Sequence, residues 1–236
     1  MNKPIVTAII PARAGSKGLK NKNTYPVLNK PLIQWTFEQA KMSKMLDNIF
    51  VSTNDKKIIS LADEFEINVI VRPDHLCSNH STSESALLHA LEVINNDYLI
   101  YPDIIVFLQA TSPLRLFDDI DKSINCFIIK NVDSMFSVTK LDDLTLWQNK
   151  NNKWKSLNFD YNNRLGRQNM PDNYIENGSI YIFKPSVLKN FNNRLGEKIA
   201  VYKMKFWQTW EIDTIEEIDL IEFYITKYKL DDCDTL

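Results

Sequence analysis

Glycine is scarce in this sequence, and its scarcity makes its placement informative. Only five glycines occur among 236 residues, and two of them, Gly15 and Gly18, lie in one short segment. Acidic residues are missing from the same region, because no Asp or Glu precedes Glu38. Glycine lets backbone N–H groups approach an anion without a Cβ in the way, and basic side chains neutralise its charge. The segment is therefore typical of a phosphate-binding loop, and its basic residues are Arg13, Lys17, Lys20 and Lys22.

Cysteine and long apolar runs are also rare. The three cysteines, Cys77, Cys126 and Cys233, are far apart and include no CxxC pair, which argues against a disulfide framework and fits a reducing cytosol. No apolar run approaches the ~20 residues of a membrane span, and the run at 5–10 is too early and too short for a signal peptide. The net charge of −2 argues against general nucleic-acid binding and against binding to an anionic membrane. We expect a soluble, cytoplasmic protein with no nucleic-acid or membrane partner.

Short apolar runs alternate with helical patterns through the first half of the chain. This alternation predicts parallel strands with crossover helices on both faces of the sheet. We therefore predict one α/β core, a three-layer α/β/α sandwich with a mostly parallel sheet. Ligands of such sheets bind beyond the carboxyl ends of the strands, so loops 11–23, 72–83 and 110–115 should converge on one cleft. The predicted strands are 5–10, 48–52, 68–71, 103–109 and 132–138, and the predicted helices are 31–45, 55–65, 83–95 and 117–129.

The pattern changes between Lys140 and Tyr174, a stretch rich in Asn and in widely spaced aromatic residues, with no helical period. We interpret it as a β-hairpin excursion from the sheet. A two-stranded excursion cannot form a core of its own, so a partner subunit is its natural cover. Further strands are predicted at 179–184 and 199–204, followed by a helix from Thr214 to about Lys229.

The loop from Ile10 to Asn23 reads IPARAGSKGLKNKN, which is neither a Walker A loop nor a dinucleotide fingerprint. It resembles the signature of cytidylyltransferases that activate sialic acids and related nine-carbon sugar acids, whose pattern is IPAR-x-GSKG followed shortly by KN. Further segments that resemble this family follow in the correct order: STND at 52–55, RP at 72–73, LQATSPLR at 108–115, RQ at 167–168, NGSIY at 177–181 and EIDT at 211–214. The resemblance implies a nucleotide-diphospho-sugar transferase-like fold, with 1–236 as a single cytidylyltransferase domain and 140–175 as an excursion for dimerisation and substrate capping.

The resemblance implies that the basic loop holds the triphosphate of CTP. Arg13 and Lys17 are expected on the β- and γ-phosphates, where an Arg fork can grip two oxygens at once. Lys22 is expected at the α-phosphate, where charge rearranges during transfer. Arg13, Lys22 and Asp213 are the predicted catalytic residues, and the alternative for the loop is a solvated basic surface. The other predicted nucleotide contacts are Ala12, Gly15, Ser16, Asn23, Arg72 and Ser83.

The sugar acid is expected at a second set of residues. Gln109 ends a buried strand, where an amide needs a polar partner such as a sugar hydroxyl or N-acyl group. Arg167 is the predicted partner of the substrate carboxylate, with Arg164 as a possible helper, because the family often has a second basic residue where this chain has Gly166. The remaining predicted contacts are Gln168, Asn177 and Tyr181, although Asn177-Gly178 also fits a hairpin turn and the Tyr181 ring also fits the core.

Glu211 and Asp213 are the predicted metal ligands. Their i, i+2 spacing on a strand end would project both side chains from the same face, and paired carboxylates aimed at phosphates usually hold Mg²⁺, which Mn²⁺ can replace. The family usually has two aspartates here, so Glu211 is a departure from its pattern. The alternative for Asp213 is an N-cap of the following helix.

Taken together, the motifs predict an enzyme that transfers CMP from CTP to the anomeric hydroxyl of a nine-carbon 2-keto sugar acid. The sequence leaves neuraminic, legionaminic and pseudaminic acids open as the substrate, and the resemblance implies a homodimer. The alternatives are a cytidylyltransferase for the eight-carbon acid Kdo, a sugar-1-phosphate nucleotidyltransferase, or a nucleotide-binding regulator without catalysis.

Overall fold

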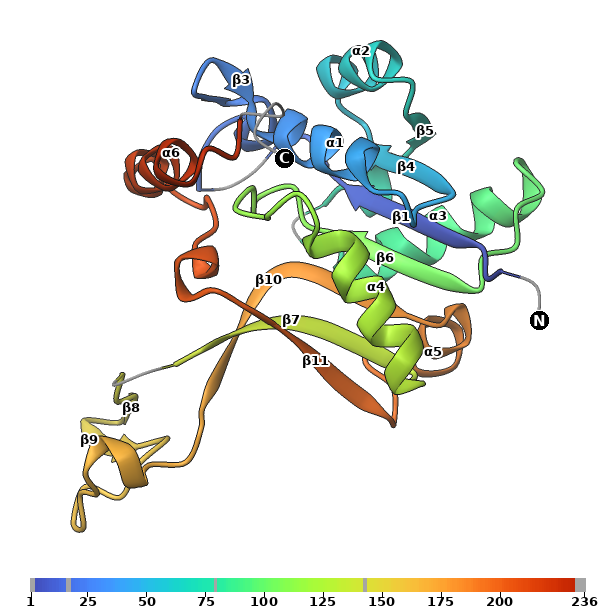
Figure 1. Cartoon of the computed structure of the whole chain (residues 1–236). Coiled ribbons are helices and arrows are strands. Elements are labelled where there is room, and N and C mark those ends of the chain that lie inside the picture. Colours follow the sequence, from blue (N-terminus) through green and yellow to red (C-terminus); the bar gives the residue numbers. More distant parts are fainter. Residues whose placement is uncertain (1–2, 16–17, 79, 142–143, 232–236) are drawn as a thin grey trace.

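The computed structural model describes residues 3–15, 18–78, 80–141 and 144–231. Within these residues the centre is a seven-stranded sheet in the order β11-β7-β10-β6-β1-β4-β5 (Figure 1). Only β10 runs antiparallel to its two neighbours in this described sheet, so the predicted mostly parallel sheet is confirmed. The strands are β1 (Val6–Pro11), β4 (Asn48–Thr53), β5 (Asn68–Val71), β6 (Ile104–Leu108), β7 (Ser134–Lys140), β10 (Tyr174–Phe183) and β11 (Ile199–Met204).

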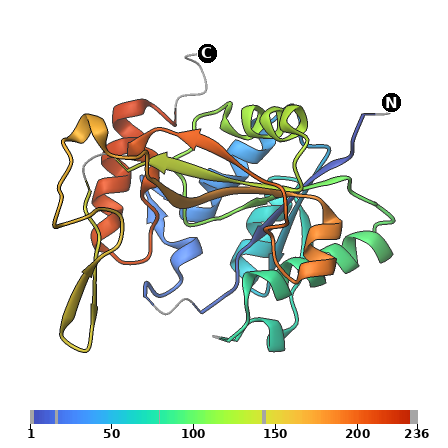
Figure 2. The same ribbon diagram turned by 90° about the horizontal axis from the view of Figure 1, so that it is seen from below.

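Helices cover both faces of the sheet, because the central strands are apolar on both sides. Ala8 and Ile10 of β1 belong to the core beneath one set of helices, whereas Ile9 belongs to the core on the opposite face. Figure 2 shows α4 and α5 on opposite sides of the sheet, and the predicted three-layer sandwich is confirmed. The first face carries α1 (Leu32–Met42), α2 (Lys56–Glu64) and α4 (Asp119–Lys130), and the second carries α3 (Ser83–Asn96) and α5 (Pro185–Phe191).

The last helix, α6 (Glu216–Tyr228), packs on a third apolar cluster at the side of the sandwich. Ile221 and Ile225 of this helix share the cluster with Trp35 of α1 and with Ile212. Ile212 is therefore an anchor for the segment that leads into α6. None of the helices in the described residues is long and apolar enough to cross a bilayer.

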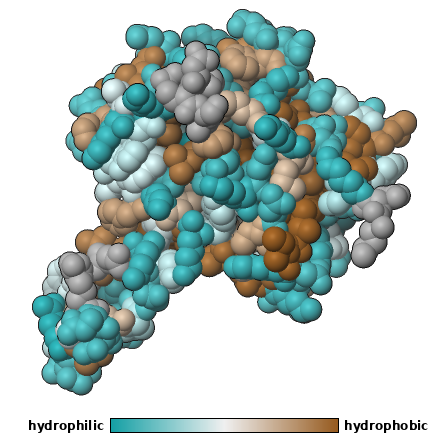
Figure 3. Space-filling view, in the orientation of Figure 1, coloured by the Kyte–Doolittle hydropathy of each residue, from teal (hydrophilic) through white to brown (hydrophobic). Residues whose placement is uncertain are grey.

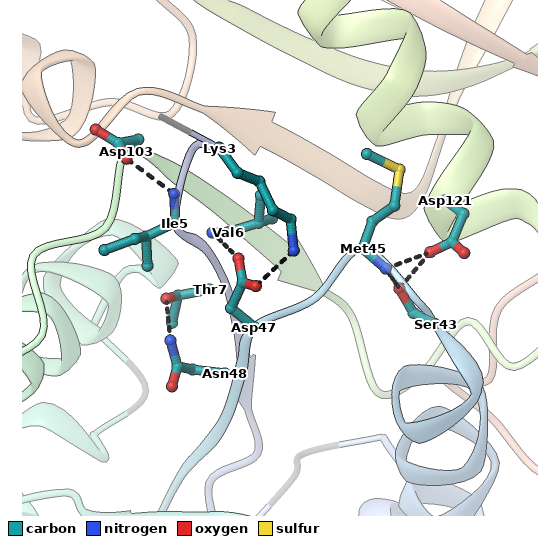
Figure 4. Close-up of polar contacts among 10 residues, drawn as sticks. All are labelled: Lys3, Ile5, Val6, Thr7, Ser43, Met45, Asp47, Asn48, Asp103 and Asp121. Atoms are coloured by element: carbon teal, nitrogen blue, oxygen red, sulfur yellow. Dashed lines mark hydrogen bonds and ion pairs between the residues drawn. The ribbon is translucent and has the colours of Figure 1, made fainter. Parts of the chain in front are cut away.

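Short polar contacts fix the amino end of the sheet (Figure 4). Asp47 accepts a hydrogen bond from the backbone N–H of Val6 at 2.9 Å and pairs with Lys3 at 2.8 Å. Asp103 accepts one from the backbone N–H of Ile5 at 2.8 Å. These carboxylates satisfy donors at the end of β1 opposite to the loops, which leaves the carboxyl ends of the strands for a ligand.

The stretch between β7 and β10 leaves the body of the molecule, as Figure 1 shows. Its hairpin joins β8 (Trp147–Lys150) to β9 (Lys153–Ser156) through Asn151 and Asn152, which both have positive φ. Asn tolerates this conformation, and two such residues make the turn that suits a tight hairpin. The predicted hairpin excursion is thus present. On the face shown in Figure 3 it is largely hydrophilic.

Several elements differ from the predictions. The strand predicted from residue 179 begins at Tyr174, and it continues through Asn177 and Gly178 with a shift of register between Glu176 and Tyr181. Gly178 has a φ of +68° inside the strand, so the hairpin turn considered for this pair is wrong. The unpredicted elements are α5, the small hairpin of β2 (Pro26–Val27) and β3 (Lys30–Pro31), and the 3₁₀ turns η1 (Lys22–Thr24), η2 (Asp74–Leu76), η3 (Arg167–Asn169) and η4 (Phe206–Thr209).

Candidate active site

A cleft of about 390 Å³ opens at the carboxyl ends of β1 and β6. The loops 11–23 and 72–83, the segment after β6 and the segment before α6 all contribute to it. It brings together eight of the residues predicted from the sequence, namely Arg13, Lys22, Asn23, Arg72, Ser83, Gln109, Glu211 and Asp213. Its other lining residues are Pro11, Gly18, Ser81, Thr82, Ala86, Phe107 and Thr111.

The basic loop is held in place by contacts with neighbouring loops. Arg13 donates through Nη1 to the carbonyl oxygen of Cys77 at 2.8 Å, and Asn23 donates to the carbonyl oxygen of Arg13 at 3.2 Å. The backbone N–H of Ala14 donates to Oδ1 of Asn54 at 2.9 Å. These contacts connect Arg13 and Ala14 to the loops after β5 and β4.

The remaining residues predicted in this loop have separate positions. Ala12 is buried, and its backbone N–H donates to the carbonyl oxygen of Ser52 at 2.9 Å. Gly15 has a φ of +75°, a conformation that favours glycine. Ser16 and Lys17 lie outside the described residues.

Lys22 and Asp213 join the basic loop to the acidic segment. Lys22 Nζ lies 2.6 Å from Asp213 Oδ1, with side chains 15% and 59% exposed respectively. The backbones also touch, because a Cβ added to Gly18 would lie 2.3 Å from the carbonyl oxygen of Asp213. Glycine at position 18 is therefore required by this close approach, and the two oppositely charged segments form one wall of the cleft.

Arg72 lies in the wall formed by the loop after β5. Its guanidinium is nearly buried and donates through Nε and Nη2 to the hydroxyl and carbonyl oxygens of Ser52, at 3.1 and 2.7 Å. Burial lowers its pKa, and the nearby positive charge of Arg13 adds to the effect. Two neighbouring positive charges that line the same cleft favour a bound anion.

Gln109, Thr111 and Glu211 form a compact polar set at the end of β6. Gln109 Nε2 donates to Thr111 Oγ1 at 2.9 Å and to Glu211 Oε2 at 2.5 Å, and Thr111 Oγ1 donates to the same carboxylate oxygen at 3.3 Å. Gly178 makes room for the set, since a Cβ there would lie 3.3 Å from Gln109 Nε2 and from Glu211 Oε2. Burial and the charge of Asp213 raise the pKa of Glu211.

The segment that carries the two carboxylates is a loop rather than the predicted strand end. Ile212 is buried between them, and its backbone N–H donates to the carbonyl oxygen of Thr111 at 2.9 Å. Glu217 Oε2 accepts from the backbone N–H groups of Asp213 and Thr214, both at 2.6 Å. The side chain of Asp213 does not cap α6, so the N-cap considered for it is wrong, and Glu217 satisfies the donors instead.

Arg115 holds the backbone of Gln109 in place and was not predicted as a site residue. Its buried guanidinium donates through Nη2 to the carbonyl oxygens of Gln109 and Ser179 at 2.7 and 2.8 Å, and through Nη1 to Gln39 Oε1 at 3.0 Å. Burial lowers the pKa of Arg115 to about 9, which keeps it protonated at neutral pH. In the sequence, Arg115 is the last residue of the TSPLR segment, and this motif is what could have indicated it.

Three predicted sugar-acid contacts do not line the cleft. Asn177 is buried, accepts from Ser137 Oγ at 2.6 Å and donates to the carbonyl oxygen of Gln208 at 3.0 Å. Tyr181 is buried next to the cleft, and burial raises its pKa. Gln168 is exposed in η3, on the excursion, and the side chain of Arg167 lies outside the described part of the structure.

The cleft residues that were not predicted are only weakly indicated by the sequence. Thr82 accepts from the backbone N–H of Ser85 at 3.1 Å as the N-cap of α3, a position that the sequence offers through a threonine before a helical run. Thr111 belongs to the LQATSPLR segment. Gly18 belongs to the GSKG segment of the basic loop, whereas Phe107 has no local pattern that distinguishes it from a core phenylalanine.

Two curated proteins are similar to this chain over most of its length. The N-acylneuraminate cytidylyltransferase of Escherichia coli O18:K1:H7 is 27% identical over 219 residues, which cover 91% of this chain and 51% of that protein. The chain thus spans about half the length of that relative. The pseudaminic acid cytidylyltransferase of Campylobacter jejuni serotype O:2 is 27% identical over 89% of this chain and 92% of its own.

A solved structure has the same fold. It is a CMP:2-keto-3-deoxy-manno-octonic acid synthetase complexed with CTP, which superposes with a TM-score of 0.69 at 18% identity and covers 95% of this chain and 99% of its own. The family model described as Cytidylyltransferase matches residues 7–227. The resemblance seen in the motifs is confirmed, and the chain belongs to the cytidylyltransferase family.

Proposed function

We propose that the protein transfers CMP from CTP to the anomeric hydroxyl of a nine-carbon 2-keto sugar acid and releases pyrophosphate. The observation that carries the proposal is the cleft that Arg13, Lys22, Gln109, Glu211 and Asp213 line together. The cationic side chains can bind a triphosphate, and the carboxylates beside them can bind the metal cation that accompanies it. The names of the relatives support a sugar acid of the sialic or pseudaminic type as the acceptor.

The chemistry is an in-line displacement at the α-phosphorus. The anomeric oxygen forms a bond to that phosphorus, the bond to the pyrophosphate oxygen breaks, and the hydroxyl proton passes to solvent. Catalysis then consists of positioning and of charge neutralisation. Arg13 neutralises the departing phosphates, and Lys22 stabilises charge at the α-phosphate. Lys22 must leave or share its ion pair with Asp213 when the nucleotide binds.

A divalent metal ion is implied by the family, and the residues present fit one. Glu211 and Asp213 offer carboxylate oxygens on the same cleft, and the raised pKa of Glu211 reflects burial and the nearby Asp213 charge. Mg²⁺ usually takes one or two carboxylates together with phosphate oxygens. Among the described residues no set of three or more His, Cys, Asp or Glu side chains is arranged to hold a metal. When bound, Mg²⁺ or Mn²⁺ would neutralise phosphate charge and lower the pKa of the attacking hydroxyl.

The sugar acid is proposed to lie beside Gln109. The amide of Gln109 already meets a carboxylate, so it can exchange that partner for a sugar hydroxyl or N-acyl oxygen. Arg167 is proposed to pair with the substrate carboxylate, because a guanidinium recognises that group in a bidentate manner. Legionaminic acid is a further candidate, since the three acids differ only in their acyl and amino groups and in ring stereochemistry.

We further propose a homodimer formed through the 140–174 excursion. Trp147 packs on Phe159 and Tyr161 with ring centroids 5.4 and 5.5 Å apart, yet Trp154 and Leu157 stay largely exposed. The excursion contributes no residue to the three core clusters of the described structure. A second copy of the chain would cover these side chains. Sedimentation equilibrium should show a dimer at micromolar concentration, and a fully active monomer would refute it.

The test of the function is pyrophosphate release with each of four nucleoside triphosphates against neuraminic, legionaminic and pseudaminic acids, with Kdo and a sugar 1-phosphate as the alternative acceptors. We expect release with CTP, with at least one of the three acids, and only with a divalent metal present. Release with Kdo alone or with a sugar 1-phosphate would move the assignment to another substrate class. Tight CTP binding without release would indicate a regulator. The Lys22→Ala variant is the matched control for contaminating activity.

A further inference from the structure

Arg194 does not line the cleft but contacts Phe107, which does, and Glu84, which is next to lining residues of α3. It lies between α5 and β11, and its guanidinium carbon is 4.4 Å from the ring centroid of Tyr181 and 5.5 Å from that of Phe107. The two rings stack on each other at 5.2 Å with an angle of 16°. Phe107 lines the cleft. Phe107 therefore contributes to the ligand space, and Arg194 contacts both rings of the stacked pair.

The same guanidinium reaches the first turn of α3. Arg194 Nη1 lies 3.1 Å from Glu84 Oε1, with both side chains about four-fifths buried. The nitrogen is buried and lacks the alignment of a hydrogen bond to any acceptor in the described structure. Glu84 follows Thr82 and Ser83, which both line the cleft. Arg194 thus connects the aromatic wall to the wall formed by the start of α3.

Stability alone does not account for this arrangement. A mostly buried ion pair gains little over an apolar pair of the same volume, because both charges lose their hydration. A charged pair instead fixes the orientation of its partners, because the planar guanidinium must contact a ring and a carboxylate at the same time. The hydroxyl of Tyr181 is fixed as well, because it donates to Glu176 Oε1 at 2.5 Å.

From these contacts we infer that Arg194 is a positioning residue for the sugar-acid part of the cleft. It holds Phe107 and the first turn of α3 at a fixed separation through Tyr181 and Glu84. Arg194 is held by Glu84 and the two rings and not by the Lys22–Asp213 pair, so it acts on the triphosphate wall only indirectly. Ser83, a predicted nucleotide contact, lies in the turn that Arg194 holds. The link to the sugar acid rests on the function proposed above, whereas the link between the two walls does not.

Two variants separate the charge from the packing. Arg194→Met keeps an unbranched apolar side chain of similar length and removes both the ion pair and the cation. Arg194→Lys keeps the charge and loses the planar fork. The matched control is Lys189→Met, which removes an exposed positive charge from the neighbouring helix α5. Glu84→Gln removes the partner charge while leaving Arg194 in place.

The first measurement is amide hydrogen exchange of the free protein, which needs no substrate. Arg194→Met should speed exchange in residues 83–87 by at least about fivefold, and Lys189→Met should leave it unchanged. Equal protection in both variants overturns the inference whether or not the enzyme has the proposed substrate.

The second measurement is steady-state kinetics with the acid that the wild-type protein uses. Arg194→Met should raise KM for the sugar acid about tenfold, with Arg194→Lys in between, while KM for CTP rises less, because Ser83 is only one of several predicted nucleotide contacts. Glu84→Gln should act in the same direction. Equal increases in both KM values, or none, overturn the link to the sugar acid. Absence of pyrophosphate release by the wild-type protein instead refutes the proposed function, and the exchange result then stands by itself.

Discussion

Gly18 offers a sharp test of how the two charged segments make the cleft, through the substitution Gly18→Ala. The added methyl group would lie 2.3 Å from the carbonyl oxygen of Asp213, and real Cβ atoms essentially never come within 3.0 Å of another atom. The opposing atom is backbone, so it cannot rotate away. The basic loop and the acidic segment must separate by at least about 0.7 Å, the difference between these two distances, for the alanine to fit.

The expected effect on catalysis is larger than the effect on stability. A displacement near 1 Å can cost about 10²-fold in rate when it misplaces reacting groups. Overpacking costs about 1–3 kcal/mol, and the lower entropy of the unfolded alanine chain returns about 0.4–1 kcal/mol. We therefore expect kcat/KM to fall about 10²-fold, with a loss of about 0–2.6 kcal/mol in the free energy of unfolding.

Pyrophosphate release and urea unfolding measure the two quantities on the same preparation. The control is Gly166→Ala, whose Cβ would meet only the flexible amide of Gln168 at 3.2 Å. It should leave KM for CTP unchanged. A Gly18→Ala enzyme with wild-type kcat/KM would show that the close approach to Asp213 does not matter for the reaction. Unfolding of the variant at room temperature would show instead that the contact is mainly structural.

The remaining predictions concern the charges of the cleft and its support. Lys22→Ala should lower kcat/KM at least ~10²-fold in the pyrophosphate assay, the usual scale for one charged transition-state contact, and a near wild-type rate would remove Lys22 from the triphosphate site. Asp213→Asn should cost far more rate than Glu211→Gln, and EDTA should abolish activity until Mg²⁺ or Mn²⁺ is restored; metal-independent turnover contradicts this. Arg115→Met should lower the free energy of unfolding by about 3 kcal/mol in urea, because buried carbonyls lose a charged donor, and an unchanged midpoint would contradict the supporting role given to it.

Local patterns predicted most of the sheet, because its strands are apolar on both faces and are bounded by helices of normal length. The start of β10 at Tyr174 was missed, since Glu176 and Asn177 interrupt the apolar run and the strand follows a register shift at Gly178. The small hairpin of β2 and β3 has two residues per strand, too few for any periodic signal. Its turn also uses Leu28 at positive φ, which sequence patterns assign to other residue types.

The candidate site was predictable where a motif concentrates charge and was missed where the contact is remote. Arg13 and Lys22 belong to one dense loop, and the carboxylates belong to another short motif. By contrast, a glycine is needed at position 18 because the backbone of Asp213 lies so close, and the residues near position 18 in the sequence do not indicate this contact. The buried roles of Asn177 and Arg115 likewise depend on β7, η4 and α1, which the chain brings together only after folding.

The separation of Lys22 and Asp213 by 191 residues also sets the order in which the cleft is made. A ribosome adds roughly 5–20 residues per second, so roughly 10–40 seconds pass between the synthesis of the two partners. During that interval β6, β1, β4 and β5 can pair, and the edge of β6 stays free until β10, Tyr174–Phe183, has been made. A nascent chain that ends before residue 211 therefore has the basic loop without either carboxylate. The cleft is completed late in translation, and an incomplete chain can attract phosphate before it has the carboxylates proposed to act on it.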